Sequence, residues 1–433
     1  MNLSPAWIEA IPAIARILII FGLVLLAMRH KWSLGNAFAG GTVALGLVFG
    51  MGPWAIVRSA GAALVQPKTI SLSVVIALIL VLSHTLEESG QMARLLDSFK
   101  GLIRRPKINL VIFPALIGLL PMPGGAIFSA PMVKNLGVSH RLSPSQLSYI
   151  NYWFRHIWEY WWPLYPGILL TTTLANVDLW RLVSVTVPLT LVAIFIGYRP
   201  LKGAIAAAEG AGQRRSMGPF LKELAPIGAV IVLSFIFGLL FSRMLPAHFE
   251  AIAKELGLIL ALVLAIVWVW QVNAMAWRER WAIIKSPALV KMVYMITAIL
   301  LFKAILEQSR AVDQVSQEML RWHIPLVPIA ILLPLLVGTV SGITIAFVGT
   351  TFPILISLIQ GFGQEPLLLP YLMLALAAGF VGVLVSPLHL CLLVSNEYFK
   401  TTLIPIYRLM RTPLIALLTS ALIYFYVLRY LWG

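Results

Sequence analysis

Three ionisable side chains lie close together in an otherwise apolar and aromatic segment. The segment NYWFRHIWEYWWPLYPG (151–167) contains Arg155, His156 and Glu159. Charged groups at membrane depth are costly and usually face a cavity or a partner. A guanidinium in such a place can bind a carboxylate through two parallel hydrogen bonds. The alternative is an interfacial aromatic belt in which Arg155 or His156 simply pairs with Glu159, three to four residues further along a helix.

Further candidate groups lie in the second half of the chain. In VGVLVSPLHLCLLVSNEYF (381–399), Pro387 predicts a helix break beside Ser386 and His389, although a hydrogen-bonded structural histidine is the alternative for His389. Acidic residues follow two other apolar runs, and one of them lies four residues after Lys303, which also permits an ordinary ion pair. The candidate ion-coupling residues are His156, Glu159, Ser386, His389, Glu87 and Glu307.

Two glycine-rich and proline-rich interruptions predict where backbone groups become free to bind a solute. LLPMPGGAIFSAPM (119–132) corresponds to VSGITIAFVGTTFP (340–353). Non-helical backbone at membrane depth is tolerated only where protein or water satisfies it. The alternative for each small residue is helix packing. Together with the polar residues of the long span, the candidate substrate-binding residues are Pro123, Gly124, Gly125, Ser129, Asn151, Arg155, Ser341, Gly342, Thr344, Thr350 and Thr351.

The elements that position these groups must be membrane-spanning helices. Apolar residues make up 60% of the 433 residues, charged residues only 11%, and the mean hydropathy is +0.93. The net charge of +16 is spread over short loops, as expected for a membrane protein, so we expect no nucleic-acid partner. The single cysteine excludes an intramolecular disulfide and a cysteine-rich metal site. The start of the chain does not resemble a cleaved signal peptide.

The order of apolar segments predicts an all-α polytopic protein built from two inverted repeats. We expect about ten transmembrane helices, two re-entrant hairpins and broken helices at the midplane. The first repeat covers 1–205, with a hairpin at about 109–137 and a broken helix at about 146–174. A cytoplasmic linker covers 206–223. The second repeat covers 224–433, with a hairpin at about 325–360 and a broken helix at about 367–395. The expected uninterrupted spans are 11–28, 36–57, 69–86, 182–198, 224–242, 256–273, 288–306 and 412–431.

The distribution of lysine and arginine predicts the orientation. If each hairpin returns to its own side, each half crosses the membrane five times and the halves have opposite orientations. Most basic residues then fall in cytoplasmic loops, as the positive-inside rule requires. We therefore expect a multi-pass protein of the inner (plasma) membrane with both termini on the outer side.

The pairing of a Pro/Gly-rich hairpin with a broken helix in each half resembles the ion transporter superfamily. This group includes divalent-anion/sodium symporters, gluconate and citrate permeases and the membrane subunits of tripartite carriers. LPMPGGAIFSAPMV and NYWFRHIWEYWWPLYPG resemble more closely a prokaryotic integral-membrane family of unknown function within it. The resemblance implies a homodimer, an elevator mechanism and coupling to Na⁺ or H⁺. The Ser-Asn-Thr tip signature of the dicarboxylate symporters is replaced here by PGG and VSG, so no sodium ligand is assigned.

These patterns favour an ion-coupled secondary transporter of a small organic anion such as a carboxylate. A transporter of amino acids or short peptides is the alternative, and an intramembrane enzyme or a channel is less favoured. The sequence has no nucleotide-binding G-x-x-x-x-G-K-[ST] and no H-E-x-x-H or G-x-S-x-G motif. We therefore expect no enzymatic activity and no cofactor, apart from Na⁺ if that is the coupling ion. The expected partners are the organic anion and the lipid bilayer.

Overall fold

The structure is a computed structural model, and it describes residues 10–99, 102, 106–121, 125–138, 142–201, 216–246, 249 and 252–432. Throughout these ranges the regular structure is helical, and they contain no strand. The helices up to residue 201 are α2 (Ala13–Arg29), α3 (Leu34–Val48), α4 (Pro53–Leu64), α5 (Pro67–Glu88), α6 (Gln91–Phe99), α7 (Pro106–Gly118), α8 (Ala126–Val138), α9 (Pro144–Arg155), α10 (Pro166–Ala175), α11 (Leu179–Thr186), α12 (Pro188–Tyr198) and the 3₁₀ turn η1 (Arg199–Leu201).

The later helices follow a similar order of long, short and interrupted elements. They are α13 (Met217–Met244), α14 (Ala253–Val272), α15 (Trp277–Ile284), α16 (Pro287–Gln308), α17 (Ala311–Arg321), α18 (Leu326–Ser341), α19 (Thr344–Gly361), the 3₁₀ turn η3 (Glu365–Leu367), α20 (Leu368–Val385), α21 (Leu390–Tyr398) and α22 (Leu403–Trp432). In both parts of the chain a helix pair (α7–α8, α18–α19) precedes an interrupted helix (α9–α10, α20–α21). The inversion of one half relative to the other remains a prediction.

The described residues contain eight helical segments that are long and apolar enough to cross a membrane. Shorter apolar helices, among them α3, α10 and α18, accompany them. The expected all-α polytopic membrane protein is confirmed. Two expected boundaries were wrong. The segment 36–57 is not one span, because the chain turns at Gly50 (φ +83°) and Pro53 starts α4. The helix α13 begins at Met217, which lies inside the expected linker 206–223.

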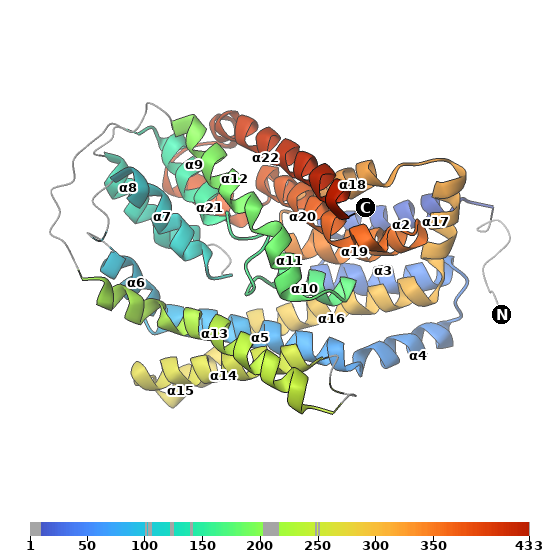
Figure 1. The fold of residues 1–433 in the computed structure, drawn as a ribbon, viewed down its shortest axis with the longest axis horizontal. Helices are drawn as coiled ribbons and strands as arrows, with labels where there is room; N and C mark the ends of the chain where they lie inside the picture. The colour runs from blue at the N-terminus through green and yellow to red at the C-terminus, as the bar shows by residue number, and fades with distance from the viewer. Residues whose placement is uncertain are drawn as a thin grey trace.

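Two groups of helices are visible in Figure 1. The long helices α5 and α16 pack against each other, α14 packs on α5, and α13 packs on α14 along one side of the molecule. On the other side, α7 packs on α8 and α9, α18 packs on α19 and α20, and α21 contacts α8 and α9. Because α21 contacts α8 and α9, the two interrupted helices come together although they are far apart in sequence.

Local sequence explains the interruptions. Pro144 and Pro166 stand at the first turns of α9 and α10, where a missing N–H costs nothing. Ser143 caps α9 with a capping box that involves Gln146. Gly342 ends α18 in the left-handed conformation, with φ of +66°. Between α20 and α21, the chain leaves helical geometry at Ser386, directly before Pro387.

Candidate functional site

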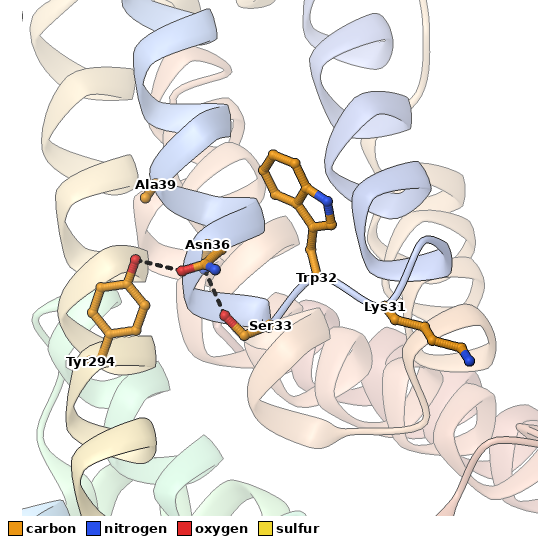
Figure 2. A pocket seen from close by; sticks show the side chains of 6 residues that line it. All are labelled: Lys31, Trp32, Ser33, Asn36, Ala39 and Tyr294. Atoms are coloured by element: carbon orange, nitrogen blue, oxygen red, sulfur yellow. Dashed lines mark hydrogen bonds between the residues drawn. The ribbon is translucent and has the colours of Figure 1, made fainter.

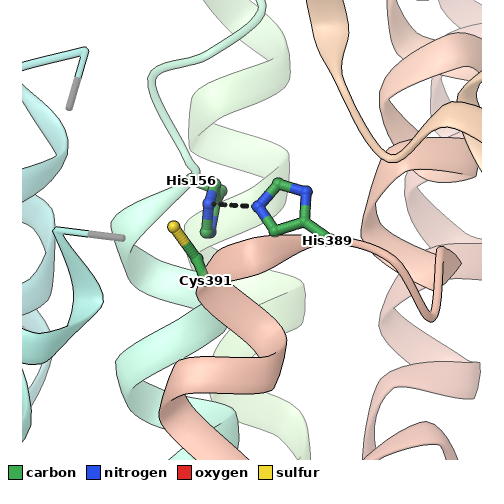
Figure 3. Close-up of side chains that lie close together, drawn as sticks. All are labelled: His156, His389 and Cys391. Atoms are coloured by element: carbon green, nitrogen blue, oxygen red, sulfur yellow. Dashed lines mark hydrogen bonds between the residues drawn. The ribbon is translucent and has the colours of Figure 1, made fainter. Parts of the chain in front are cut away.

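Two buried histidines join the interrupted helices. His156 is the residue that ends α9, and His389 directly precedes α21. Their Nε2 atoms lie 3.1 Å apart, and both side chains are buried (Figure 3). The breaks predicted at 146–174 and 367–395 therefore meet at one point.

The backbone fixes which nitrogen of His156 carries a proton. Nδ1 of His156 lies 2.6 Å from the carbonyl oxygen of Tyr152, which can only accept a hydrogen bond. Nδ1 is therefore the protonated atom of the neutral ring, and the lone pair is on Nε2. In this state Nε2–H of His389 donates to His156. Nδ1 of His389 has no hydrogen-bond partner among the described residues.

Glu159 connects the histidines to the second helix pair. Its Oε1 lies 3.7 Å from Nε2 of His156, and its Oε2 accepts a hydrogen bond of 2.9 Å from Oγ1 of Thr344. Thr344 is the first residue of α19, directly after the α18–α19 turn. A methyl group on Gly167 would lie 2.8 Å from Cγ2 of Thr344, so the start of α10 also packs closely on this turn.

Arg155 lies against the first helix pair. Its side chain is only 3% exposed. A methyl group on Gly125 would come within 2.5 Å of a guanidinium nitrogen, so the missing side chain of Gly125 leaves the space that the guanidinium occupies. Pro123 and Gly124 lie outside the described residues. The structure thus places the end of the α7–α8 turn on Arg155 and the α18–α19 turn on Glu159, four residues further along the chain.

A buried network around Asn151 holds the first helix pair on the interrupted helices. Oγ of Ser129 donates to Oδ1 of Asn151 at 2.6 Å. Nδ2 of Asn151 donates to the carbonyl of Ala126 and to Oγ of Ser395, each at 2.9 Å. Because Ser129 is on α8 and Ser395 is on α21, this one amide links three helices. These hydrogen bonds show that Asn151 positions the helices. Its predicted contact with a substrate stays a prediction.

The α18–α19 turn packs on the second break. A methyl group on Gly342 would lie 2.8 Å from Oγ of Ser386 and 3.1 Å from the amide nitrogen of His389. Ser386 accepts a hydrogen bond of 3.2 Å from the amide of Leu388, which shapes the break itself. Ser341 is buried next to this turn.

Four other predicted residues make no hydrogen bond or ion pair with this cluster in the described part of the chain. Thr350 and Thr351 are buried, and their hydroxyl groups donate to the carbonyls of Ala346 and Phe347 on their own helix, which is a packing arrangement. Glu307 is exposed and pairs with Lys303 at 3.4 Å, as the ordinary alternative predicted. Glu87 is half-buried in the last turn of α5.

Sequence reasoning missed Cys391. Its thiol, Nε2 or Nδ1 of His156 and a ring nitrogen of His389 all lie within 4.8 Å of one another. A single cysteine in an apolar helix does not by itself indicate a site. The only sequence feature that could have identified Cys391 is its position two residues after His389. Tyr165 was also missed, and its hydroxyl donates to the carbonyl of Gly118 at 2.7 Å, closing the first break against α7.

The structure also has a surface hollow that contains none of the predicted residues. It has a volume of about 520 Å³ and is lined by residues of the α2–α3 turn, α3 and α16 (Figure 2). Tyr294 donates to Oδ1 of Asn36 at 2.9 Å across it. The hollow is open to the outside and none of its lining residues is a predicted site residue, so we place the candidate site at the helix breaks.

The fold and most of the sequence have known relatives. The family described as "Protein of unknown function (DUF401)" matches residues 17–428. The comparison with curated proteins found no match. Among solved structures, the crystal structure of the YdaH transporter of Alcanivorax borkumensis, described as having an unusual topology, matches with a TM-score of 0.58 and covers 87% of each chain. At 14% identity, this similarity shows a shared fold alone.

Proposed function

The chain belongs to the DUF401 family of proteins of unknown function, and we propose that it is a proton-coupled secondary transporter of a small organic anion. The observation that carries this proposal is the buried Arg155 at the meeting point of two helix breaks. The division of the helices, the chemistry of the buried cluster and the fold shared with a transporter also support it.

Arg155 supports an anionic substrate. A buried guanidinium is costly unless anionic or hydrogen-bonding groups compensate it. The adjoining Gly125 brings backbone close to the guanidinium. A carboxylate bound in this place would gain a charge-assisted, two-point contact. We assign the substrate carboxylate to Arg155 and the end of the α7–α8 turn.

The division of the helices supports an elevator mechanism. The α7–α8 and α18–α19 pairs are joined to α9, α20 and α21 by packing and, in places, by buried polar contacts. The helices α5, α13, α14 and α16 form a second layer, which touches the first group where α16 packs on α19 (Figure 1). We propose that the first group carries the substrate and moves against the second. The homodimer and the outer location of both termini remain predictions.

The chemistry of the cluster favours H⁺ over Na⁺ as the coupling ion. Na⁺ is a hard cation that prefers oxygen ligands, whereas the groups gathered here are two imidazoles, a thiol and one carboxylate. The titratable and charged groups that meet are Arg155, His156, Glu159, His389 and Cys391, with the Tyr152 and Tyr165 hydroxyls nearby. A proton shared by His156, His389 and Glu159 would change the charge next to Arg155, and so would change the affinity for an anion.

Amino acids or short peptides are the second candidate substrate. Glu159 favours them, because a carboxylate four residues from Arg155 could bind the amino group of a zwitterion. Both oxygens of Glu159 are already near His156 and Thr344, so we rank this candidate second.

Uptake of labelled compounds into proteoliposomes tests the proposal. We expect carboxylates to accumulate when the outside is acidic and the sodium concentrations are equal. Uptake driven only by an inward Na⁺ gradient would contradict proton coupling. Accumulation of amino acids but not of simple carboxylates would favour the second candidate. Uptake that follows neither gradient would overturn the symporter proposal.

A further inference from the structure

His156, His389 and Cys391 form a buried cluster of the side-chain types that bind transition metals. We propose that this cluster, completed by Glu159, binds one borderline or soft divalent cation of the Zn²⁺ class and thereby fixes the two helix breaks to each other. The metal ion and the proposed coupling proton would use the same side chains and would therefore compete for this cluster. The test below measures the metal directly and does not depend on transport.

The positions of the ligand atoms favour coordination. The two Nε2 atoms lie 3.1 Å apart, and the three potential ligand atoms lie within 4.8 Å of one another (Figure 3). Two nitrogens bound to tetrahedral Zn²⁺ at 2.0–2.1 Å are roughly 3.3 Å apart. The imidazoles therefore already have almost the required separation. The thiol of Cys391, at the start of α21, lies within 4.8 Å of the ligand nitrogens of both rings and would have to come closer for coordination.

The second contact of His156 is typical of a metal ligand. Metal-binding histidines usually donate the other ring N–H to a carbonyl or carboxylate, which fixes the tautomer and the ring orientation. Nδ1 of His156 donates to the carbonyl of Tyr152 at 2.6 Å, so its lone pair is held on Nε2, facing His389. The backbone therefore holds the first ligand in the orientation that coordination requires.

Glu159 is the fourth ligand that we assign, although it lies beside His156 and outside the group of three, so its carboxylate would have to move toward His389 and Cys391. Its Oε1 lies 3.7 Å from Nε2 of His156, while its Oε2 is held by the hydroxyl of Thr344. Two imidazoles, a thiolate and a carboxylate suit Zn²⁺ or Co²⁺ and do not suit Na⁺, Mg²⁺ or Ca²⁺. The negative charges of the thiolate and the carboxylate offset the two positive charges of the ion. This balance matters because the guanidinium of Arg155 adjoins the site.

Binding requires a defined proton movement. The S–H bond of Cys391 breaks, the sulfur lone pair binds the metal, and the proton is released to solvent. The Nε2 proton of His389 moves to Nδ1 of the same ring, so the charge of that ring does not change. Because Nδ1 has no hydrogen-bond partner among the described residues, this move breaks no existing bond there. Starting from neutral imidazoles and an ionised Glu159, one proton is therefore released for each ion bound, and a proton shared by the cluster would be released in addition.

Titration of the purified full-length protein with Co²⁺ tests the site, because thiolate bound to Co²⁺ gives a near-ultraviolet charge-transfer absorption. We expect one equivalent of Co²⁺ to produce this absorption, one equivalent of Zn²⁺ to abolish it, and one proton to be released per ion. The wild-type chain has one cysteine, so the signal identifies its ligand without any variant. Absence of the absorption in the wild-type protein, or its insensitivity to Zn²⁺, would overturn the proposal.

Variants assign the remaining ligands. Cys391→Ser should abolish the charge-transfer absorption, and His389→Gln and His156→Gln should each weaken Zn²⁺ binding by at least about 10-fold. His323→Gln is the matched control, because His323 is exposed at the end of α17, and it should bind Zn²⁺ like the wild type. The melting temperature in detergent establishes that each variant is folded. Equal Zn²⁺ affinity in the folded His389→Gln and His323→Gln variants would contradict the assignment.

Discussion

The Nε2 atoms of His156 and His389 lie 3.1 Å apart although 233 residues separate them in the chain. This contact joins the end of α9 to the start of α21, and each of these points is a break in a helix. In the sequence, His156 and His389 each had an ordinary structural alternative, but in the fold they meet at the centre of one buried cluster. A change in the charge of either histidine therefore affects both helix breaks.

Gly342→Ala should destabilise the protein. Gly342 has a φ of +66°, and an added methyl group would lie 2.8 Å from Oγ of Ser386. The left-handed conformation alone costs an alanine about 1–2 kcal/mol, and the crowding adds roughly 1–3 kcal/mol. Gly363→Ala is the matched control, because Gly363 has a φ of +65° with nothing within 4 Å. Thermal unfolding in detergent should show a larger loss for Gly342→Ala, and equal losses would contradict close packing on the break.

Gly125→Ala should impair substrate binding more than stability. The new methyl group would lie 2.5 Å from a guanidinium nitrogen of Arg155 and would displace that group. We expect KM for the anion to rise at least about 10-fold, since a displaced charged hydrogen bond costs about 1.5–3 kcal/mol. Gly228→Ala is the control, because nothing lies within 4 Å of its added methyl group. An unchanged KM in Gly125→Ala would show that Gly125 is not part of the substrate site.

Asn151→Ala should destabilise the protein more than Ser129→Ala. The amide of Asn151 makes hydrogen bonds with Ser129, Ala126 and Ser395, whereas the hydroxyl of Ser129 has one good partner. Each buried group left without a partner costs about 1–3 kcal/mol. We therefore expect losses of about 2–4 kcal/mol for Asn151→Ala and about 1 kcal/mol for Ser129→Ala, measured by denaturant or thermal unfolding. The reverse order would show that the network does not hold α8 on α21.

Asp178 should make stability depend on acid pH. Burial raises its pKa, but the hydrogen bond from Lys254 and those from the backbone N–H groups of Arg181 and Trp180 outweigh burial and lower the pKa below its ordinary value. Because the folded pKa is below the unfolded value of about 3.9, the contribution is complete above the unfolded pKa. It is lost as the pH falls through the folded pKa.

The variant Asp178→Asn isolates this charge, because asparagine also caps a helix well. We expect it to lower the melting temperature at pH 7 only slightly, since exposed ion pairs contribute about 0–1 kcal/mol. The difference between the variant and the wild type should shrink as the pH falls below about 4. A difference that stays constant down to pH 3 would show that the charge of Asp178 contributes nothing.

The helix breaks could be predicted from sequence because their causes are local. Pro387 and Gly342 each interrupt a helix through their own backbone properties, and Gly125 directly precedes α8. The i,i+4 pair of Lys303 and Glu307 also followed from spacing alone. The split of 36–57 into α3 and α4 was missed because apolar residues continue through the Gly50–Pro53 turn.

The composition of the site could be predicted only in part. Arg155, His156 and Glu159 are close in sequence, so their proximity required only a helix or a short break. The contact of Cys391 and His389 with these residues depends on packing between distant segments, and no periodicity encodes it. Thr350 and Thr351 resembled site residues by type, but their hydroxyl groups are used by their own helix. The type of a residue, without knowledge of its neighbours in space, does not show whether it packs within a helix or binds a substrate.

We propose that Arg155 binds the transported anion, and uptake by the variant Arg155→Gln tests this role. Arg278→Gln is the control, because Arg278 is exposed at the start of α15. Both variants are compared with the wild type in proteoliposomes at equal protein density under the same inward proton gradient. We expect Arg155→Gln to reduce initial carboxylate uptake at least about 100-fold, equivalent to about 2.7 kcal/mol, and Arg278→Gln to transport like the wild type. Wild-type uptake by folded Arg155→Gln would show that Arg155 does not bind the anion.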